Sequence, residues 1–549
     1  MAFEEDHRLI SGNIVDPLRA EIYPGTLEIR GHKIANIMRE NNRYDTFLIP
    51  GFIDAHIHIE SSMLVPAEFA RLAVMHGTVS TLSDPHEIAN VMGIDGVEYM
   101  IENGGTVPFK FYFGAPSCIP ASPFESSGAS LNSNVIDTLL AKEEIKYLSE
   151  VMNFPGVLND DPEMMAKIEI AKKYKKPIDG HAPGLGGRSL EKYIRAGIST
   201  DHETVDYDEG LEKLSLGMKL LIREGSAAKN LDTLYPLIIR YPDQCMFCSD
   251  DKHPDDLLRG HIKQMAERAL MMGLDIMNVL KCTCVNAVKH YGLDVGLLQK
   301  GDPADFLVVD NLKEFNILKA YINGQIVAER GNTLLLHAPV RTLNNFRAQE
   351  KDISDFEVQK RGERINVIVA IDGQIHTDHI LAVPKSLNGK VVADIKRDIL
   401  KIVVVNRYTN SLPAIGFVKN FGLQRGAIAS SVAHDSHNIV AVGTTDDDIC
   451  TAVNLLIARR GGLSVVSSGF REVLPLPIAG IMSNEDGVSV AKQYVRLDIL
   501  TKKILGTRLT APFMTLSFMA LSVIPKLKIT DQGLFDVENV RLIDVFENS

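Results

Sequence analysis

Cysteine is scarce in this sequence, with six residues in a chain of 549. So few cysteines do not make the disulfide framework that is typical of small secreted proteins. An excess of basic residues is also absent, because 58 Lys and Arg stand against 70 Asp and Glu, and the formal net charge is -12. This balance, without a long basic run, argues against nucleic acid or an anionic membrane surface as the main partner.

Long hydrophobic runs are absent too. No uncharged apolar stretch approaches the ~20 residues that a membrane-spanning helix needs, so we expect no membrane partner. The N-terminal sequence MAFEEDHRLISGNIVD is acidic and lacks the apolar segment of a secretion signal. With 45% apolar and 23% charged residues, the chain has ordinary globular composition. We therefore expect a cytoplasmic protein with several domains.

Strand-like and helix-like segments alternate through residues 51–299. Eight strand candidates lie before residue 252, and the fourth is expected within residues 149–157, after a helical stretch at 141–148. Alternation of this kind predicts an α/β fold with a parallel sheet closed into a (β/α)₈ TIM-like barrel. Residues 1–50 and 300–340 contain short strands with turn signals. We expect these two segments to pair into one small β-domain that flanks the barrel.

The pattern changes after residue 340. The sequence RINVIVAIDGQI predicts a hairpin that turns at Asp372 and Gly373. Residues 438–469 predict a strand, a helix and a strand, with Thr444 or Thr445 as the N-cap and three aspartates near the positive end of the helix. Residues 341–549 are therefore expected to form a C-terminal α+β domain.

Two histidines, His56 and His58, lie two residues apart in the strand-like segment PGFIDAHIHIESSM. Residues i and i+2 of a strand face the same side, so both imidazoles are aimed at one point. Neutral imidazole is the commonest metal ligand. A pair of buried core histidines would give the same pattern, so the rest of the chain has to decide between the two interpretations.

Further polar residues follow the other strands of the predicted barrel. In a barrel of this class, chemistry takes place at the carboxyl ends of the strands. Four imidazoles and two carboxylates at these ends can hold two divalent cations, with one carboxylate as a bridge. The residues are His56, His58, Glu150, His181, His202 and Asp250, with Asp251 as the alternative to Asp250.

Several motifs resemble those of the amidohydrolase superfamily and, within it, the adenine deaminase family of bacteria and archaea. They include DGHAPGL and CSDDKHPDDL, and the most specific of them are HIESSM, EVMNFPGV and, in the C-terminal region, AHDSHN. The resemblance covers nearly the whole chain. It implies a binuclear centre with Mn²⁺, or alternatively Fe²⁺ or Zn²⁺, and the six strand-end residues as its ligands. It also implies conversion of adenine and water to hypoxanthine and ammonia.

The ligands predict the chemistry once the resemblance supplies adenine as the substrate. Two cations lower the pKa of a water molecule, and the resulting hydroxide attacks C6 of adenine. A strand-end carboxylate, Asp250 by analogy, would take the water's proton and pass it to the departing amine. Glu150 and Glu203 are the other carboxylates that we assign to catalysis, Glu203 by supporting its neighbour His202.

Other polar residues are candidates for substrate binding. Asp84, His86 and Glu87 follow the second strand, where they would contact substrate, hold a further metal or orient the ligands by hydrogen bonds. His434, Asp435 and His437 lie in a polar loop that would either reach over the barrel mouth or form a hydrogen-bond cluster within its own domain. Arg223 and Ser226 end the seventh strand, where they would meet the base or belong to a buried ion pair.

Two other functions fit the ligand set. Another amidohydrolase would act on a cyclic amide or on a different aminated heterocycle. A metal-binding scaffold without catalysis is the third hypothesis, which the intact ligand set argues against. A homo-oligomer is expected, while the physiological metal and the residues that read the purine edges are open.

Overall fold

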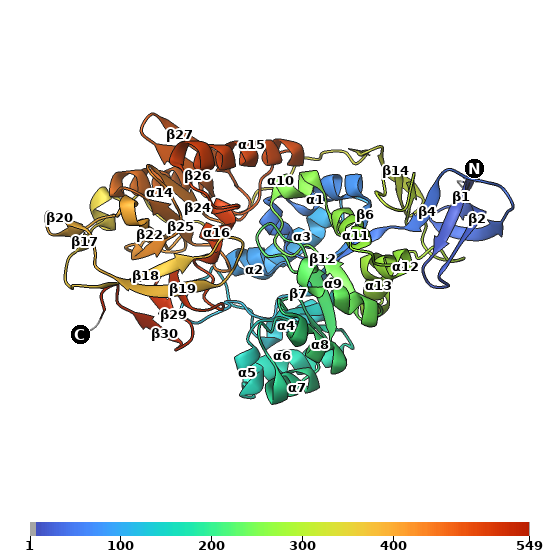
Figure 1. Ribbon diagram of the computed structural model, residues 1–549, viewed down its shortest axis with the longest axis horizontal. Helices are drawn as coiled ribbons and strands as arrows, with labels where there is room; N and C mark the ends of the chain where they lie inside the picture. Colours follow the sequence, from blue (N-terminus) through green and yellow to red (C-terminus); the bar gives the residue numbers. More distant parts are fainter. Residues whose placement is uncertain (1–6, 548–549) are drawn as a thin grey trace.

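Residues 7–547 are described by the computed structural model, and they form an elongated molecule (Figure 1). A small β-sheet lies at one end, a barrel lies in the middle, and a sheet with the last helices lies at the other end. We propose that the boundaries expected from the sequence divide the folded chain into these parts. Residues 1–6 and 548–549, at the ends of the outer domains, lie outside the described residues.

Parallel strands close into a barrel in the middle part. Strands pair from β5 to β9 and from β10 to β12. Backbone hydrogen bonds from Ser199 to Ile178 and from Asp250 to His56, both 2.9 Å, join the two sheets. The predicted barrel is therefore confirmed. Among the described residues its strands are β5 (Phe52–Ile57), β6 (Thr78–Ser83), β7 (Lys110–Ala115), β8 (Ile145–Val151), β9 (Ile178–Gly180), β10 (Thr200–Asp201), β11 (Lys219–Arg223) and β12 (Cys245–Cys248).

Helices connect these strands and follow the last one, and sequence signals mark both ends of the first helical segment. Helix α1 has Pro66 in its first turn, and after a short 3₁₀ turn the segment ends at Gly77, whose φ of 78° suits glycine. The helices are α1 (Pro66–Ala73), α2 (His86–Met92), α3 (Ile94–Gly104), α4 (Ser133–Leu140), α5 (Phe154–Leu158), α6 (Pro162–Lys173), α7 (Gly187–Arg195), α8 (Tyr207–Ser215), α9 (Leu231–Arg240), α10 (Pro254–Arg259), α11 (Ile262–Met271), α12 (Ile276–Leu280) and α13 (Asn286–Tyr291).

The fourth strand differs from the expectation. Helix α4 ends at Leu140, and β8 already begins at Ile145, within the stretch that the sequence predicts to be helical. Burial in the barrel determines the conformation here, because Ile145 and Tyr147 are fully buried in the sheet while Lys146 between them is partly exposed. The strand continues through Glu150, which places that carboxylate at the barrel mouth.

The flanking sheet contains strands from both ends of the barrel segment. Strands β4 and β13 pair antiparallel, which joins the two chain segments into one sheet. The first segment contributes β1 (His7–Asp16), β2 (Glu21–Arg30), β3 (Lys33–Arg39) and β4 (Phe47–Pro50), and the second contributes β13 (Phe306–Val309), β14 (Ile317–Ile322), β15 (Gln325–Glu329) and β16 (Asn332–Thr333).

The C-terminal part is built on a mixed sheet in the order β19-β18-β23-β22-β25-β24-β26-β27. The predicted hairpin is present as β18 and β19, and the predicted strand, helix and strand are β25, α14 and β26. Its larger elements are β18 (Ile365–Ala370), β19 (Thr377–Ala382), β22 (Ile399–Val405), β23 (Ala414–Lys419), β24 (Ala427–Ser430), β25 (Ile439–Gly443), α14 (Asp446–Arg459), β26 (Gly462–Ser467), β27 (Phe470–Pro475), α15 (Gly487–Leu500), α16 (Pro512–Phe518), β28 (Leu527–Thr530), β29 (Gly533–Asp536) and β30 (Arg541–Ile543).

The barrel and the C-terminal part share one apolar core. Leu64, which follows β5, and Tyr494 of α15 belong to the same cluster of buried side chains. The backbone of Ser483 donates a hydrogen bond of 2.8 Å to Met63, and Gly487 donates one of 2.9 Å to the buried carboxylate of Glu68. Apolar burial of this extent fixes the C-terminal part against the barrel.

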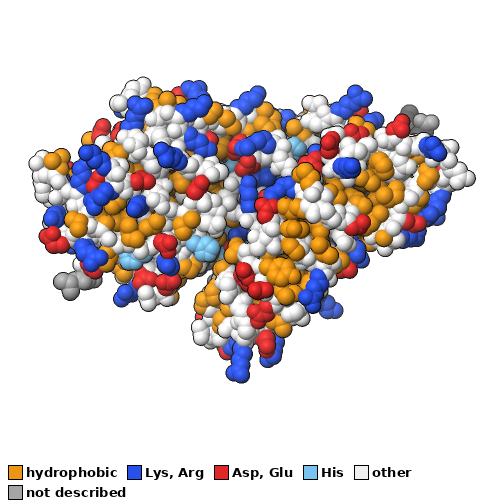
Figure 2. All heavy atoms as spheres, viewed as in Figure 1, with side chains coloured by type: hydrophobic (Ala, Val, Ile, Leu, Met, Phe, Trp, Pro, Cys, Tyr) orange, Lys and Arg blue, Asp and Glu red, His pale blue; other side chains and the backbone are white. Residues whose placement is uncertain are grey.

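The surface is mixed in character. On the face seen in Figure 2, basic and acidic side chains are interspersed with apolar ones. Within residues 7–547, no helix is long and apolar enough to cross a membrane.

Replacing Thr445 by Ala should destabilise the start of α14. Its side chain accepts a hydrogen bond from the backbone of Asp448, and loss of such an N-cap costs about 1 kcal/mol. Hydrogen exchange should therefore become faster at the first amides of α14. Thr445→Ser keeps the hydroxyl and should leave exchange unchanged, so equal exchange in both variants would contradict the assignment of the cap.

Candidate metal centre

His56 and His58 extend from the end of β5 into the barrel mouth, where both are buried. Nδ1 of His58 lies 3.1 Å from the backbone oxygen of Asp84, an acceptor, so this nitrogen carries a proton. Nε2 of His58 then faces Glu150 Oε1 at 3.2 Å and Asp250 Oδ1 at 3.3 Å. Nε2 of His56 is buried without a hydrogen-bond partner. Both imidazoles therefore present Nε2 to the same carboxylates.

Glu150 lies between two pairs of histidines. Its Oε1 faces His58 and, at 3.9 Å, His56, whereas Oε2 lies 2.7 Å from Nδ1 of His181 and 3.2 Å from Nε2 of His202. Burial raises the pKa of Glu150, but the imidazoles, His202 foremost, hold it well below its ordinary value. A carboxylate whose two oxygens serve different ligand pairs has the arrangement needed to bridge two cations.

The end of β12 separates the side chains of Asp250 and Asp251. Asp250 has a φ of 54°, and its Oδ1 turns toward His56 at 3.6 Å and toward His58. Asp251 turns the other way, toward the hydroxyl of Ser61 at 2.5 Å. Of the two aspartates, Asp250 therefore faces the histidines.

Arg223 at the end of β11 holds two of these carboxylates. Its guanidinium donates to both oxygens of Glu203, at 2.5 and 2.8 Å, and to Oδ2 of Asp250 at 2.5 Å. Burial raises the pKa of Asp250, but Arg223 and the two histidines hold it well below its ordinary value. Arg223 thus belongs to a buried ion pair. Ser226 lies apart from this group, and its hydroxyl donates to Asp256 at 2.5 Å.

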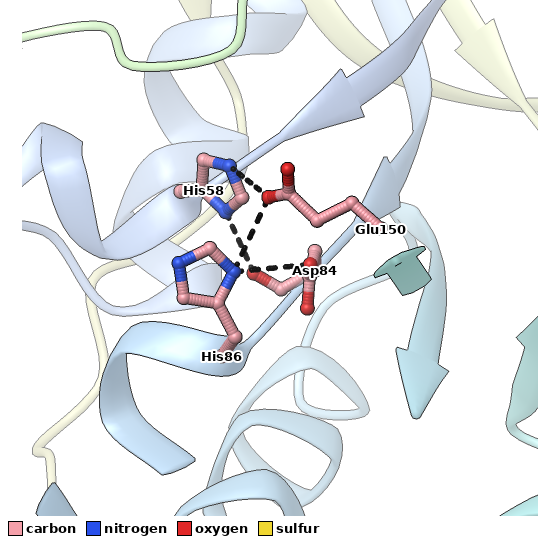
Figure 3. Close-up of side chains that lie close together, drawn as sticks. All are labelled: His58, Asp84, His86 and Glu150. Carbon is pink, nitrogen blue, oxygen red and sulfur yellow. Dashed lines mark hydrogen bonds and ion pairs between the residues drawn. The ribbon is translucent and has the colours of Figure 1, made fainter. Parts of the chain in front are cut away.

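Residues after β6 add a second layer of contacts (Figure 3). His86 lies with Nδ1 3.0 Å from Asp84 Oδ2 and 3.4 Å from Glu150 Oε1, while its Nε2 faces Asp435 of the C-terminal part at 3.7 Å. Asp84 also accepts a hydrogen bond of 2.7 Å from Ser149. Asp84 and His86 therefore fix the ligands on one side and contact the C-terminal part on the other.

Glu87 lies beside His434 and His437, the two histidines of the polar loop in the C-terminal part. Nδ1 of His434 is 3.1 Å from Oε1 of Glu87, and Nε2 of His437 is 3.4 Å from Oε2. The polar loop of the C-terminal part therefore reaches the barrel mouth. These contacts cross from the C-terminal part to the barrel, and a role of the loop in substrate binding stays a prediction.

The site opens into a larger space between the barrel and the C-terminal part. A small pocket of about 40 Å³ is bordered by the histidines and carboxylates, and a cavity of about 590 Å³ adjoins it. Met152, Glu203, Arg223, Ala228 and Ile375 border both. No local pattern points to Ile375, Phe518 and Leu521 of the C-terminal part, which are apolar and reach the small pocket only through tertiary packing.

The donor set fits divalent cations. Several overlapping groups of buried side chains each bring their potential ligand atoms, one per residue, within 4.8 Å of one another. One group is His56, His58 and Asp250, and another is His56, Glu150 and His202. Burial and His86 lower the pKa of His58, but Asp250 and Glu150 hold it well above its ordinary value. A proton on His58 then balances the charge of these carboxylates, and metal binding would release that proton.

Comparisons with known proteins point in one direction. The model of the amidohydrolase family matches residues 47–327, and that of the adenine deaminase C-terminal domain matches residues 374–541. The adenine deaminase of Sulfurovum sp. (strain NBC37-1) is 54% identical over 535 residues, covering 97% of this chain and 99% of the relative. That of Salinibacter ruber is 52% identical over 538 residues, with 98% of each chain covered.

Replacing Glu150 by Gln should remove one or both cations from this centre, because a neutral amide cannot bridge them. After chelation and reconstitution with Mn²⁺, the metal content per chain, measured by mass spectrometry, should fall by about one to two equivalents. Glu169→Gln, on an exposed side chain of α6, should change nothing. Equal metal content in the Glu150→Gln variant and the unmodified protein would contradict the bridging role.

Proposed function

This chain belongs to the adenine deaminase family of amidohydrolases and catalyses hydrolytic deamination of adenine to hypoxanthine and ammonia, and we propose that it does so with two divalent cations held at the barrel mouth. The arrangement of Glu150 between two pairs of histidines supports this proposal most directly. We assign His56, His58 and Asp250 to one cation and His181 and His202 to the other, with Glu150 shared.

The cations, when bound, would lower the pKa of a water molecule so that it becomes a nucleophile near neutral pH. Mn²⁺ is the metal we propose, since mixed imidazole and carboxylate ligands accept it together with Fe²⁺ and Zn²⁺. A cytoplasmic location and a homo-oligomeric state stay predictions from the sequence.

Asp250 is suited to move the proton. Its Oδ2 is held by Arg223, which leaves Oδ1 free to face the centre. Because Arg223 and the histidines favour the ionised form, Asp250 can accept a proton from the attacking water and donate it to the amine at C6. The amino group is a poor leaving group until that proton arrives, and it then leaves as ammonia. General acid–base assistance of this kind contributes roughly 10²–10⁴-fold to a rate.

Glu203 and Arg223 position the reacting groups. Glu203 Oε1 lies 3.6 Å from Nδ1 of His181 and 3.4 Å from Nε2 of His202, and its two hydrogen bonds with Arg223 keep it there. Both residues also border the small pocket and the large cavity. We propose that adenine enters through the large cavity and passes these two side chains on its way to the centre.

The C-terminal part closes the pocket over the substrate. Ile375, Phe518 and Leu521 provide apolar surface, and Asp435 provides a buried carboxylate that faces His86. Exclusion of water strengthens the electrostatic interactions in such a site. We therefore propose that Asp435 and His86 contact the purine ring, with Asp84 fixing His86.

Protein reconstituted with Mn²⁺ should release ammonia from adenine with the accompanying ultraviolet change. His56→Ala and Asp250→Asn should each lower kcat/KM by about 10²–10⁴-fold, because the first removes a ligand and the second removes the proton acceptor. Adenosine, cytosine, guanine and dihydroorotate serve as the comparison panel. Turnover of one of these compounds instead of adenine would identify a different amidohydrolase.

Replacing Asp435 by Asn should weaken the pocket without removing a metal ligand. Loss of a hydrogen bond to a charged group costs about 1.5–3 kcal/mol, so kcat/KM for adenine should fall about 10- to 100-fold while the Mn²⁺ content is unchanged. Asp447→Asn, on the exposed face of α14, is the matched control in the same domain. Unaltered kcat/KM in Asp435→Asn would rule out a contribution of this carboxylate.

A further inference from the structure

A second cluster of potential ligands lies where the C-terminal part meets the barrel. Glu87 after β6, Asp251 after β12 and His434 of the C-terminal loop each offer one ligand atom, and these atoms lie within 4.8 Å of one another. Glu87 and His434 are buried, and Asp251 is nearly so. None of the three belongs to the six residues assigned to the catalytic cations.

The hydrogen bonds in this cluster do not satisfy its carboxylates. The hydroxyl of Ser61 lies 2.9 Å from Oε1 of Glu87 and 2.5 Å from Oδ1 of Asp251. A hydroxyl has one proton, so it can donate to only one of these oxygens. The carboxylate oxygen that Ser61 does not reach has only His434 as a donor in this cluster. Two buried carboxylates at one hydroxyl are costly unless a positive charge lies between them.

His434 points into the cluster with an unpartnered atom. Its Nε2 is buried without a hydrogen bond and faces Asp251 Oδ1 at 3.7 Å, and its Nδ1 faces Glu87 Oε1 at 3.1 Å. The ring stacks on Phe518 with centroids 5.1 Å apart and planes at 27°, which fixes its direction. The geometry of the ring therefore directs one imidazole nitrogen toward each of the two carboxylates.

His437 faces the second carboxylate oxygen of Glu87. The backbone N–H of Ala433 donates to Nδ1 of His437 at 3.2 Å, so the proton of the neutral ring is on Nε2. This Nε2 lies 3.4 Å from Oε2 of Glu87. Protein metal sites commonly hold their ligands by such outer contacts. Oε2 thus faces His437 without a hydrogen bond, and Oε1 is the oxygen directed at Ser61 and His434.

We propose that Glu87, Asp251 and His434 bind a further divalent cation, separate from the catalytic pair, which joins the C-terminal loop to the barrel. One imidazole with two carboxylates suits Mn²⁺, Fe²⁺ or Zn²⁺, and the Ser61 hydroxyl lies within reach of the same ion. The ion would offset the negative charge of the two carboxylates. It would also hold the C-terminal loop at the barrel mouth, because His434 is adjacent to Asp435, which borders the small pocket.

Metal content tests this site directly. After chelation and reconstitution with Mn²⁺ alone, the unmodified protein should hold about three equivalents per chain, and His434→Gln and Glu87→Gln should each hold about one fewer. His379→Gln, on an exposed strand of the same domain, is the matched control and should retain the full amount. Two equivalents in the unmodified protein, or an unchanged content in both cluster variants, would overturn the proposal.

A second measurement separates this site from the catalytic centre and from misfolding. In the Glu150→Gln background, Mn²⁺ should still raise the thermal unfolding midpoint through the remaining ion, since a ligand that binds only the folded state stabilises it. The rise should be smaller in the combined Glu150→Gln and His434→Gln variant. Anomalous diffraction at the manganese edge from crystals of the unmodified protein should show a peak between Glu87, Asp251 and His434, and absence of that peak would refute the site.

Discussion

The contact between the buried carboxylate of Glu150 and four imidazoles is the interaction on which the rest of the structure depends. A buried charge is tolerated only where other charges and hydrogen bonds compensate it. Here the compensation comes from His58, His181 and His202 at short distances and from His56 slightly farther away. His56 and His58 lie at the end of β5, whereas His181 and His202 follow β9 and β10. Closure of the barrel is therefore needed to bring these side chains together.

A buried network behind the ligands fixes the relation between the first and last strands. Asp54 of β5 accepts hydrogen bonds from the backbone of Ser249 at 3.0 Å and from Nε2 of His261 at 2.8 Å. The other ring nitrogen of His261 lies 2.7 Å from the hydroxyl of Thr78 at the start of β6. This network holds β5, β6 and β12 in register, and the register sets the positions of His56, His58 and Asp250. Interactions far from the substrate thus determine the geometry of the ligands.

The C-terminal part contributes side chains to the site at the barrel mouth. Its sheet and helices share the apolar core of the barrel, so the polar loop with His434, Asp435 and His437 is held over the barrel mouth. The same packing supplies Ile375, Phe518 and Leu521 to the pocket. An open barrel mouth would leave the ligands in water, where electrostatic interactions between them are weak. We therefore propose that the deaminase chemistry depends on both parts of the chain.

The sequence by itself determined the barrel, the hairpin, the capped helix α14 and the strand ends that carry the candidate ligands. Periodicity and spacing carry this information because they record local geometry: His56 and His58 share a strand face wherever that strand lies. Tertiary structure alone decided that β8 begins at Ile145, that Asp250 and not Asp251 faces the histidines, and that Arg223 is held in an ion pair. It also brought Glu87 to His434, across 347 positions of the chain (434 − 87). Contacts of this kind arise from burial and from the closure of the barrel, which act between segments that no local pattern connects.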